Sequence, residues 1–477
     1  MTRRDFAVAA AAALPAAAPS QGQTQAPPNL VLILSDDHSY PYLGCYGHPD
    51  LRTPNLDRFA SEGMRFDRAF QAAPQCVPSR TALLTGRSPV SARMGRFNSP
   101  LPPDVVTLPE LLREQKGYFT GVCRRWFHLD GSGRPGPINA DIFARNGTLT
   151  WERRIDFIDR TGDRTKTGDV VNQFLDKKPA GKPFFLWVNF SDPHHPWDRA
   201  KEGGAYDPAK ISLPQQLPDL PGVRDEVSRY YDEITRMDSE FQAVLDALKA
   251  RGFADNTLVI FMGDNGMAFP HGKGSLYDPG LHVPLLARWK GRIKPGSTSA
   301  DLISGEDITP TLLDAAGLAT VKPMSGRSFL RHLTGQHYAA RKHVFGARLH
   351  HGSSGFTSTT KANTFDLSRC VRTATHKLIY NCTPQMEYAP VDSAGGPGWT
   401  QMTAAHQEGK LAPAIDRAYF QRPRPVFELF DLANDPNEFH NLAGKPEVAD
   451  IEKELKIALQ EKMITDYDYL PLPLGEV

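Results

Sequence analysis

The sequence predicts an α/β fold, with a mixed, mainly parallel sheet flanked by helices and a smaller C-terminal α+β domain that holds an antiparallel sheet. Two segments of strand length, residues 29–34 and 256–262, each contain five consecutive apolar residues bounded by polar ones, as in strands buried on both faces. Between them, residues 224–250 repeat apolar side chains every three or four positions, which predicts a long helix. Helix and strand therefore alternate along the chain, as in a parallel sheet.

The composition bounds the size and the partners of the protein. The 477 residues are enough for more than one domain with a large core. The 55 basic and 54 acidic residues nearly cancel, to a net charge of +1, and no long run carries one sign. We therefore expect neither nucleic-acid binding nor broad attachment to a membrane surface.

The first 26 residues read as a targeting segment. Arg3 and Arg4 precede an alanine-rich run over residues 7–18, and small residues follow. This pattern is typical of a twin-arginine signal peptide, and the run is too short and too weakly apolar to span a bilayer. The alternative is a core or membrane helix. We expect export to the periplasm or the medium without stable membrane insertion. The rest of the chain is expected to form a catalytic domain at 27–345 and a C-terminal domain at 346–477.

Each of the two apolar strands is followed by side chains with oxygen ligands. Asp36 and Asp37 follow the first strand, and Asp264 and Asn265 follow the second. In open α/β sheets ligands bind outside the carboxyl ends of the strands, and adjacent carboxylates repel unless a cation lies between them. Three carboxylates and an amide form a hard oxygen set, which favours Ca²⁺, with Mg²⁺ the weaker alternative. A loop cap is the alternative for the first aspartate pair alone.

The stretch C-V-P-S-R-T-A-L-L-T-G-R begins at Cys76 and predicts a helix. Pro78 suits a first helical turn, and Gly86 suits a helix end. Cys76 then stands at the helix N-terminus, where unpaired N–H groups favour an anion, either a thiolate or a bound oxyanion ester. Arg80 adds positive charge. A buried structural cysteine is the alternative.

Three further segments place cationic or protonatable groups near predicted strand ends or in loops. His194 follows a strand in the pattern D-P-H-H-P, Lys273 lies in a glycine-rich segment, and R-R-W-F-H begins at Arg124. An isolated histidine is more often structural, and most lysines lie on the surface.

The run C-x-P-S-R followed by T-x-x-L-T-G-R resembles the maturation signature of the type I sulfatases, whose fold is alkaline-phosphatase-like. The resemblance extends over roughly residues 28–445. It includes D-P-H-x-P and, over residues 429–443, L-F-D-L-x-x-D-P-x-E-x-x-N-L-A. The segments 264–270 and 276–280 look closest to the heparan N-sulfatase-like branch of the family.

This resemblance implies a nucleophile and a metal site. Cys76 would be oxidised by a formylglycine-generating enzyme to formylglycine, whose hydrate attacks sulfur. Residue 76 would then join the four strand-end residues, Asp36, Asp37, Asp264 and Asn265, as ligands of one divalent metal ion.

The resemblance also implies roles for the cationic residues. Arg80 would hold the hydrated aldehyde, Lys273 would neutralise the sulfate oxygens and His194 would donate a proton. The segment beginning at Arg124 departs from the family's G-K-W-H pattern by an arginine and one extra residue. Arg125 and His128 are the candidates for the family's lysine and base, with Arg124 as the alternative cation.

The resemblance implies hydrolysis of a sulfate ester or sulfamate, with a sulfated carbohydrate as the first expectation and another small sulfate ester as a second. A phosphonate monoester or phosphodiester hydrolase with the same nucleophile is the alternative enzyme. A glycan-binding pseudoenzyme is the alternative without catalysis.

The C-terminal domain is predicted from short strands at 370–373, 377–382 and 428–432 and a closing helix at 446–462. An exported protein can form disulfides, and Cys370 with Cys382 is the pair that two adjacent strands could bridge. The residues from 130 to 167, rich in Gly, Pro and Arg, are expected to form a long surface loop.

Overall fold

The computed structural model describes residues 26–95, 99–130, 137–161, 167–198, 206–351, 366–388 and 390–474. The expected twin-arginine signal lies outside the described residues, except for Ala26. None of the helices in these ranges combines the length and the apolar character needed to cross a bilayer.

The large sheet is mixed and mainly parallel, as predicted. Among the described residues its order is β4-β3-β5-β1-β6-β7-β2-β8, with β9 paired to β2. The strands from β4 to β6 run parallel, whereas β7 is antiparallel to both β6 and β2. The bounds are β1 Asn29–Ser35, β2 Met64–Phe70, β3 Phe119–Cys123, β4 Phe157–Ile158, β5 Phe184–Asn189, β6 Thr257–Gly263, β7 His282–Arg288, β8 Ser297–Ser299 and β9 Ile303–Ser304.

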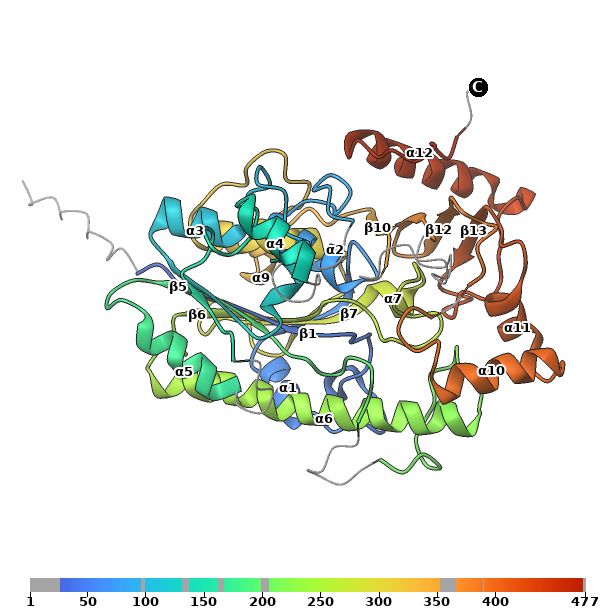
Figure 1. The fold of residues 1–477 in the computed structure, drawn as a ribbon, viewed down its shortest axis with the longest axis horizontal. Helices are drawn as coiled ribbons and strands as arrows, with labels where there is room; N and C mark the ends of the chain where they lie inside the picture. Colours follow the sequence, from blue (N-terminus) through green and yellow to red (C-terminus); the bar gives the residue numbers. More distant parts are fainter. Residues whose placement is uncertain are drawn as a thin grey trace, which may run out of the picture.

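Helices cover both faces of this sheet (Figure 1). One layer contains α1 (Pro54–Ser61), α5 (Thr167–Lys177) and α6 (Pro221–Ala250), the long helix that the periodicity predicted. The opposite layer contains α2 (Cys76–Thr85), α3 (Leu108–Lys116), α8 (Ile308–Ala315) and α9 (Leu330–Leu333). Strands β1, β5 and β6 are therefore buried on both faces, which explains their uninterrupted apolar runs.

A second sheet is antiparallel throughout, in the order β10-β11-β12-β13. Its strands are β10 Val344–Arg348, β11 Ser368–Arg372, β12 His376–Asn381 and β13 Phe427–Asp431, and the expected domain boundary falls inside β10. Helix α12 (Ala449–Thr465) covers one face of this sheet, and the other face packs on the first domain near Phe70 and Leu276. Helix α10 (Pro397–Gln407) packs against α6, and α11 (Pro413–Phe420) packs on α10 (Figure 1).

The predicted disulfide between Cys370 and Cys382 is wrong, because both thiols are free. Cys370 lies opposite Ile379 in the register between the two strands. The N–H of Cys382 bonds to the carbonyl of Leu367, so Cys382 lies opposite a position three residues before Cys370. Side chains alternate between the two faces of a sheet, so an odd offset puts the two cysteines on opposite faces. Cys370 accordingly packs towards Phe70, whereas Cys382 packs on the side of α12.

The expected loop from 130 to 167 contains regular structure. Helix α4 (Pro137–Arg145) and the two-residue strand β4 lie within it, and β4 extends the large sheet beyond β3. Gly and Pro are concentrated before the helix, in residues 131–136. A two-residue strand is too short to produce a periodic pattern, so this part of the prediction was wrong.

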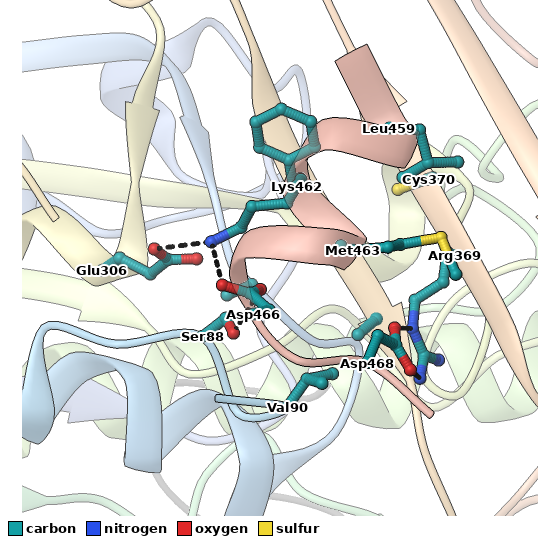
Figure 2. A pocket seen from close by; sticks show the side chains of 14 residues that line it. Ser88, Val90, Glu306, Arg369, Cys370, Leu459, Lys462, Met463, Asp466 and Asp468 are labelled. Atoms are coloured by element: carbon teal, nitrogen blue, oxygen red, sulfur yellow. Dashed lines mark hydrogen bonds and ion pairs between the residues drawn. The ribbon is translucent and has the colours of Figure 1, made fainter. Parts of the chain in front are cut away.

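The last turn of α12 is tied to the segment that follows α2 (Figure 2). Ser88 Oγ donates to Asp466 Oδ2 at 2.6 Å, and Lys462 Nζ lies 3.1 Å from Asp466 Oδ1 and 3.6 Å from Glu306 Oε2. These contacts line a pocket enclosed by α12, the second sheet and segments of the first domain. The C-terminal domain therefore contacts the segment that directly follows the helix beginning at Cys76.

Candidate functional site

The site is built at the adjacent carboxyl ends of β1 and β6. Ser35 pairs with Gly263, so the two aspartates that follow β1 lie beside Asp264 and Asn265, all four fully buried. The backbone N–H of Asp37 donates to Asp264 Oδ1 at 3.1 Å. The parallel register thus brings together the two pairs of residues, as expected from the two strand ends.

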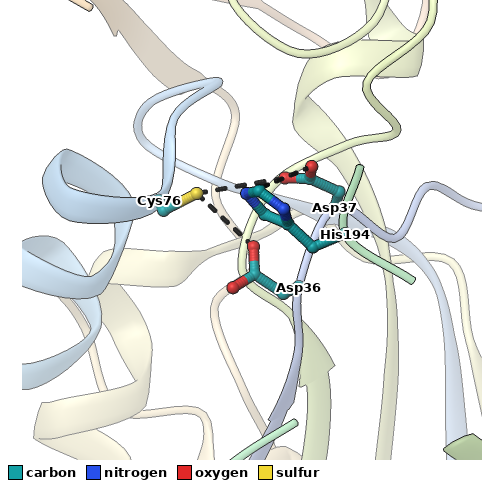
Figure 3. A group of neighbouring side chains, drawn as sticks. All are labelled: Asp36, Asp37, Cys76 and His194. Carbon is teal, nitrogen blue, oxygen red and sulfur yellow. Dashed lines mark hydrogen bonds and ion pairs between the residues drawn. The ribbon is translucent and has the colours of Figure 1, made fainter. Parts of the chain in front are cut away.

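Cys76 is the first residue of α2 and points at these carboxylates (Figure 3). Its Sγ lies 3.4 Å from Asp36 Oδ1 and 3.9 Å from Asp37 Oδ1. Burial and the negative charge of Asp36 raise the pKa of the Cys76 thiol well above its ordinary value. Without a cation these groups therefore disfavour the thiolate, the first of the two anions expected at this helix N-terminus.

Arg80 lies one helical turn after Cys76 and faces the same side. Its side chain is fully buried, with Nε 2.8 Å from Asp264 Oδ2 and Nη2 3.0 Å from Asp36 Oδ2. Nη1 donates to Asn189 Oδ1 at the end of β5. A single guanidinium thus holds the ends of β1, β5 and β6 in a fixed arrangement.

Of the two candidate arginines, Arg125 is the one that reaches the site. Its Nη1 lies 3.0 Å from Asp36 Oδ2 and 3.5 Å from His128 Nε2. Arg124 instead donates from Nη2 to Thr167 Oγ1 at 3.3 Å. Burial, followed by the charge of Arg80, lowers the pKa of His128 well below its usual range, so this imidazole is neutral.

Lys273 and His194 complete the group. Lys273 Nζ lies 2.8 Å from Asp37 Oδ1 and 3.2 Å from His194 Nε2, and its side chain is buried. The Nδ1–H of His194 donates to the carbonyl of His195, which leaves Nε2 as an acceptor facing the lysine. Burial and the charge of Lys273 lower the pKa of His194 to about 3.

The residues present fit a hard divalent cation. Ligand atoms of Asp36, Asp37, Cys76 and His194 all lie within 4.8 Å of one another. Asn265 Oδ1 is buried and has no hydrogen-bond partner among the described residues. Burial raises the pKa of Asp37, and burial with Asp36 raises the pKa of Asp264 to about 6, which marks a surplus of negative charge. A cation would remove that surplus and give the orphaned amide oxygen a partner.

Three polar residues of the site were not predicted. Asn189 ends β5 and binds Arg80, and the same strand-end signal that identified Asp36 could have found it. Asp392 Oδ2 lies 2.5 Å from Lys273 Nζ, and His351 Nε2 lies 3.4 Å from Asp392 Oδ1. Asp392 and His351 lie in the C-terminal part of the chain and belong to no sequence motif.

Comparison with known families gives two matches. Residues 28–318 match the family model described as sulfatase, which is more than half of the chain. Residues 269–408 match the model described as N-sulphoglucosamine sulphohydrolase, C-terminal.

Individual relatives extend over nearly the whole chain. The chain is 30% identical to human N-sulphoglucosamine sulphohydrolase, over 90% of this chain and 88% of that protein. It is 28% identical to an ulvan-active sulfatase of Formosa agariphila, over 90% of this chain and 78% of that protein.

Solved structures share the fold at low sequence identity. A protein in complex with its substrate D-glucosamine-2-N,6-O-disulfate has a TM-score of 0.67 and 19% identity, covering 94% of this chain and all of that one. A phosphonate monoester hydrolase from Silicibacter pomeroyi has a TM-score of 0.68 and 20% identity, covering 93% and 96%. The alkaline-phosphatase-like fold is thus confirmed, and a phosphonate monoester hydrolase shares this fold.

Proposed function

The chain belongs to the sulfatase family, in its heparan N-sulfatase-like branch, and we propose that this hydrolase cleaves a sulfate ester or sulfamate of a sulfated glycan. One observation carries the proposal: a buried lysine, Lys273, contacts the same carboxylate, Asp37, as Cys76. A fixed ammonium beside the reacting residue is suited to the oxygens of a sulfo group. The relatives named for glucosamine sulfates support a sulfated amino sugar as the first substrate to test.

We propose that Cys76 acts after oxidation to formylglycine by a formylglycine-generating enzyme. The place of Cys76 at the start of α2, against the carboxylates, suits a group that attacks an anionic substrate with help from nearby cations.

The carboxylates of Asp36, Asp37 and Asp264, with the amide oxygen of Asn265 and residue 76, would hold the metal ion, for which we propose Ca²⁺. A bound divalent cation supplies a Lewis acid that polarises oxygen and lowers the pKa of a neighbouring hydroxyl. Asp36 has the negative charge that a metal ligand needs. Burial alone would raise its pKa, but the guanidinium groups of Arg125 and Arg80 hold it below its ordinary value, so it stays ionised.

The cations and imidazoles divide the remaining tasks. Lys273 binds the sulfo oxygens, and Arg80 and Arg125 hold Asp36 in place. His128 is neutral and can accept a proton as a general base. His194 Nε2 lies 3.2 Å from Lys273 Nζ, so an imidazole protonated at Nε2 is positioned to donate a proton to the leaving group while Lys273 stays cationic on the sulfo oxygens. An anionic substrate would offset the lysine charge and raise the pKa of His194 towards this task.

Turnover on matched aryl substrates tests the reaction class. We expect 4-nitrophenyl sulfate to be cleaved with a higher kcat/KM than 4-nitrophenyl phenylphosphonate. Release of sulfate from glucosamine N-sulfate and from N-acetylglucosamine 6-sulfate tests the substrate class. The opposite aryl preference would favour the phosphonate hydrolase, which the fold shared with the Silicibacter pomeroyi enzyme keeps as the second candidate. Binding of these sugars without turnover would indicate a pseudoenzyme.

We also propose export by the twin-arginine route, on the basis of Arg3, Arg4 and the alanine-rich run. Replacing both arginines by lysine should keep the protein in the cytoplasm. Unchanged export of that variant would contradict the proposal.

A further inference from the structure

The segment between β12 and α10 brings a carboxylate to the opening of the site. Asp392 Oδ2 lies 2.5 Å from Lys273 Nζ and 3.9 Å from His194 Nε2. The side chains of Asp392 and His194 are 24% and 23% exposed, whereas that of Lys273 is 1% exposed. A ligand that reaches the lysine from solvent therefore passes these two side chains.

The neighbours of Asp392 fix it in this place. Ser393 Oγ donates to the carbonyl of Ala268 at 2.6 Å, and Val391 packs on Gly274. A Cβ at Gly274 would lie 2.5 Å from Val391 Cγ1, so this contact is close. Ala268 and Gly274 both lie on the loop that carries Lys273. The carboxylate is thus held next to the lysine by its surroundings as well as by the ion pair.

A second contact orients the carboxylate. His351 Nε2 lies 3.4 Å from Asp392 Oδ1, and its Nδ1 lies 3.2 Å from Gln75 Nε2. Gln75 Oε1 accepts from the N–H of Leu349 at 3.1 Å, so the Gln75 amide nitrogen is the donor to Nδ1. His351 then carries its proton on Nε2, facing Asp392. A chain of contacts thus links Gln75, the residue before Cys76, to the carboxylate at the opening.

This inference rests on the proposed sulfatase function and names a residue that selects the substrate. We propose that Asp392 binds the sugar itself: while Lys273 contacts the sulfo oxygens, the Asp392 carboxylate accepts a hydrogen bond from a hydroxyl group beside the sulfo group. A carboxylate can only accept, and each of its oxygens has two lone pairs. Oδ2 is buried against Lys273, so Oδ1, which also contacts His351, is the oxygen left for a substrate donor. The same charge repels a second sulfate or a carboxylate at this position.

The geometry predicts opposite effects on two kinds of ligand. Asp392 competes with an incoming sulfate for the Lys273 ammonium and adds negative charge where an anion must bind. Inorganic sulfate gains nothing from Asp392, because it has no hydroxyl to donate. A sulfated sugar offsets the unfavourable effect of the Asp392 charge, because its hydroxyl group donates a hydrogen bond to the carboxylate.

Binding to a chain that cannot turn over tests this directly. In metal-loaded protein carrying Cys76→Ala, the affinities for glucosamine N-sulfate, N-acetylglucosamine 6-sulfate and inorganic sulfate are measured by calorimetry, with and without Asp392→Asn. We expect Asp392→Asn to weaken the better-bound sugar about tenfold or more, and to leave the affinity for inorganic sulfate unchanged or higher. Asp207→Asn, which removes an exposed carboxylate paired with Lys210, is the control for net charge.

Two results would overturn the inference. One is a change in the affinities for the sugars and for inorganic sulfate in the same direction, which would mean that Asp392 acts only through Lys273. The other is a failure of both sugars to bind more tightly than inorganic sulfate before the substitution. Failure of the proposed function is a separate result: the chain with Cys76 intact would release no sulfate from any sulfated sugar, whatever the binding experiment shows.

Discussion

Arg80 Nε and Asp264 Oδ2 lie 2.8 Å apart, and neither side chain is exposed to solvent. The same guanidinium also pairs with Asp36, so removal of Arg80 leaves buried Asp264 without its main cation and buried Asp36 with Arg125 as its remaining guanidinium partner. For Arg80→Ala we expect the free energy of unfolding, measured by denaturant titration in a chelator, to fall by about 3–5 kcal/mol.

Lys290→Ala is the matched control for Arg80→Ala. Lys290 and Asp255 are 2.8 Å apart with side chains 69% and 73% exposed, and we expect a loss below about 1 kcal/mol. Equal losses of unfolding free energy in the two variants would show that burial does not determine how strongly the Arg80 ion pairs stabilise the fold.

Asp264→Ala tests the metal site. Asp264 is one of three buried carboxylates that converge near Cys76, and its removal takes away one candidate ligand. Calcium content, measured by mass spectrometry of the acid-digested protein, and sulfatase activity should fall together. The account of the metal site fails if the variant keeps full activity after chelation.

Stability should fall in mild acid because several buried histidines are held neutral. His282 stacks between Tyr40 and Phe70, and burial lowers its pKa to about 3. A histidine of lowered pKa contributes stability above its unfolded pKa of about 6.5, and the contribution is lost as pH falls from there towards 3. The unfolded chain takes up the proton first in this window, so the free energy of unfolding decreases as pH falls.

His282→Phe isolates this effect, because it keeps the ring stack and removes the titration. Between pH 7 and pH 5 the loss of unfolding free energy should be about 2 kcal/mol smaller than in the parent. Urea titrations at both pH values measure it, and His337→Gln, at an exposed position, is the control. An identical pH dependence in His282→Phe and the parent would contradict the assignment.

The sequence predicted the strand-end residues because their signal is local. Asp36 and Asp264 each follow an uninterrupted apolar run, and parallel pairing of β1 with β6 brings the ends of such runs together. Helix α2 was predicted equally well, from Pro78 near its start and Gly86 at its end. These features depend on periodicity and on the backbone preferences of single residues.

Contacts between distant segments could not be read in this way. Asp392 reaches Lys273 only because the segment before α10 packs on the lysine loop, and no local pattern records that packing. The Cys370 to Cys382 pairing failed because the facing of each cysteine depends on the register between β11 and β12. The choice of Arg125 over Arg124 likewise depended on the backbone turn after β3, where both residues have positive φ.

The central claim is that Cys76 works as formylglycine, and the mass of the peptide containing Cys76, taken from protein of measured activity, tests it most directly. We predict that the peptide carries an aldehyde in place of the thiol, in proportion to activity. Cys76→Ala should abolish turnover while the unfolding transition stays cooperative, since its small side chain keeps the start of α2 intact. An unmodified Cys76 thiol throughout a fully active preparation would contradict the account.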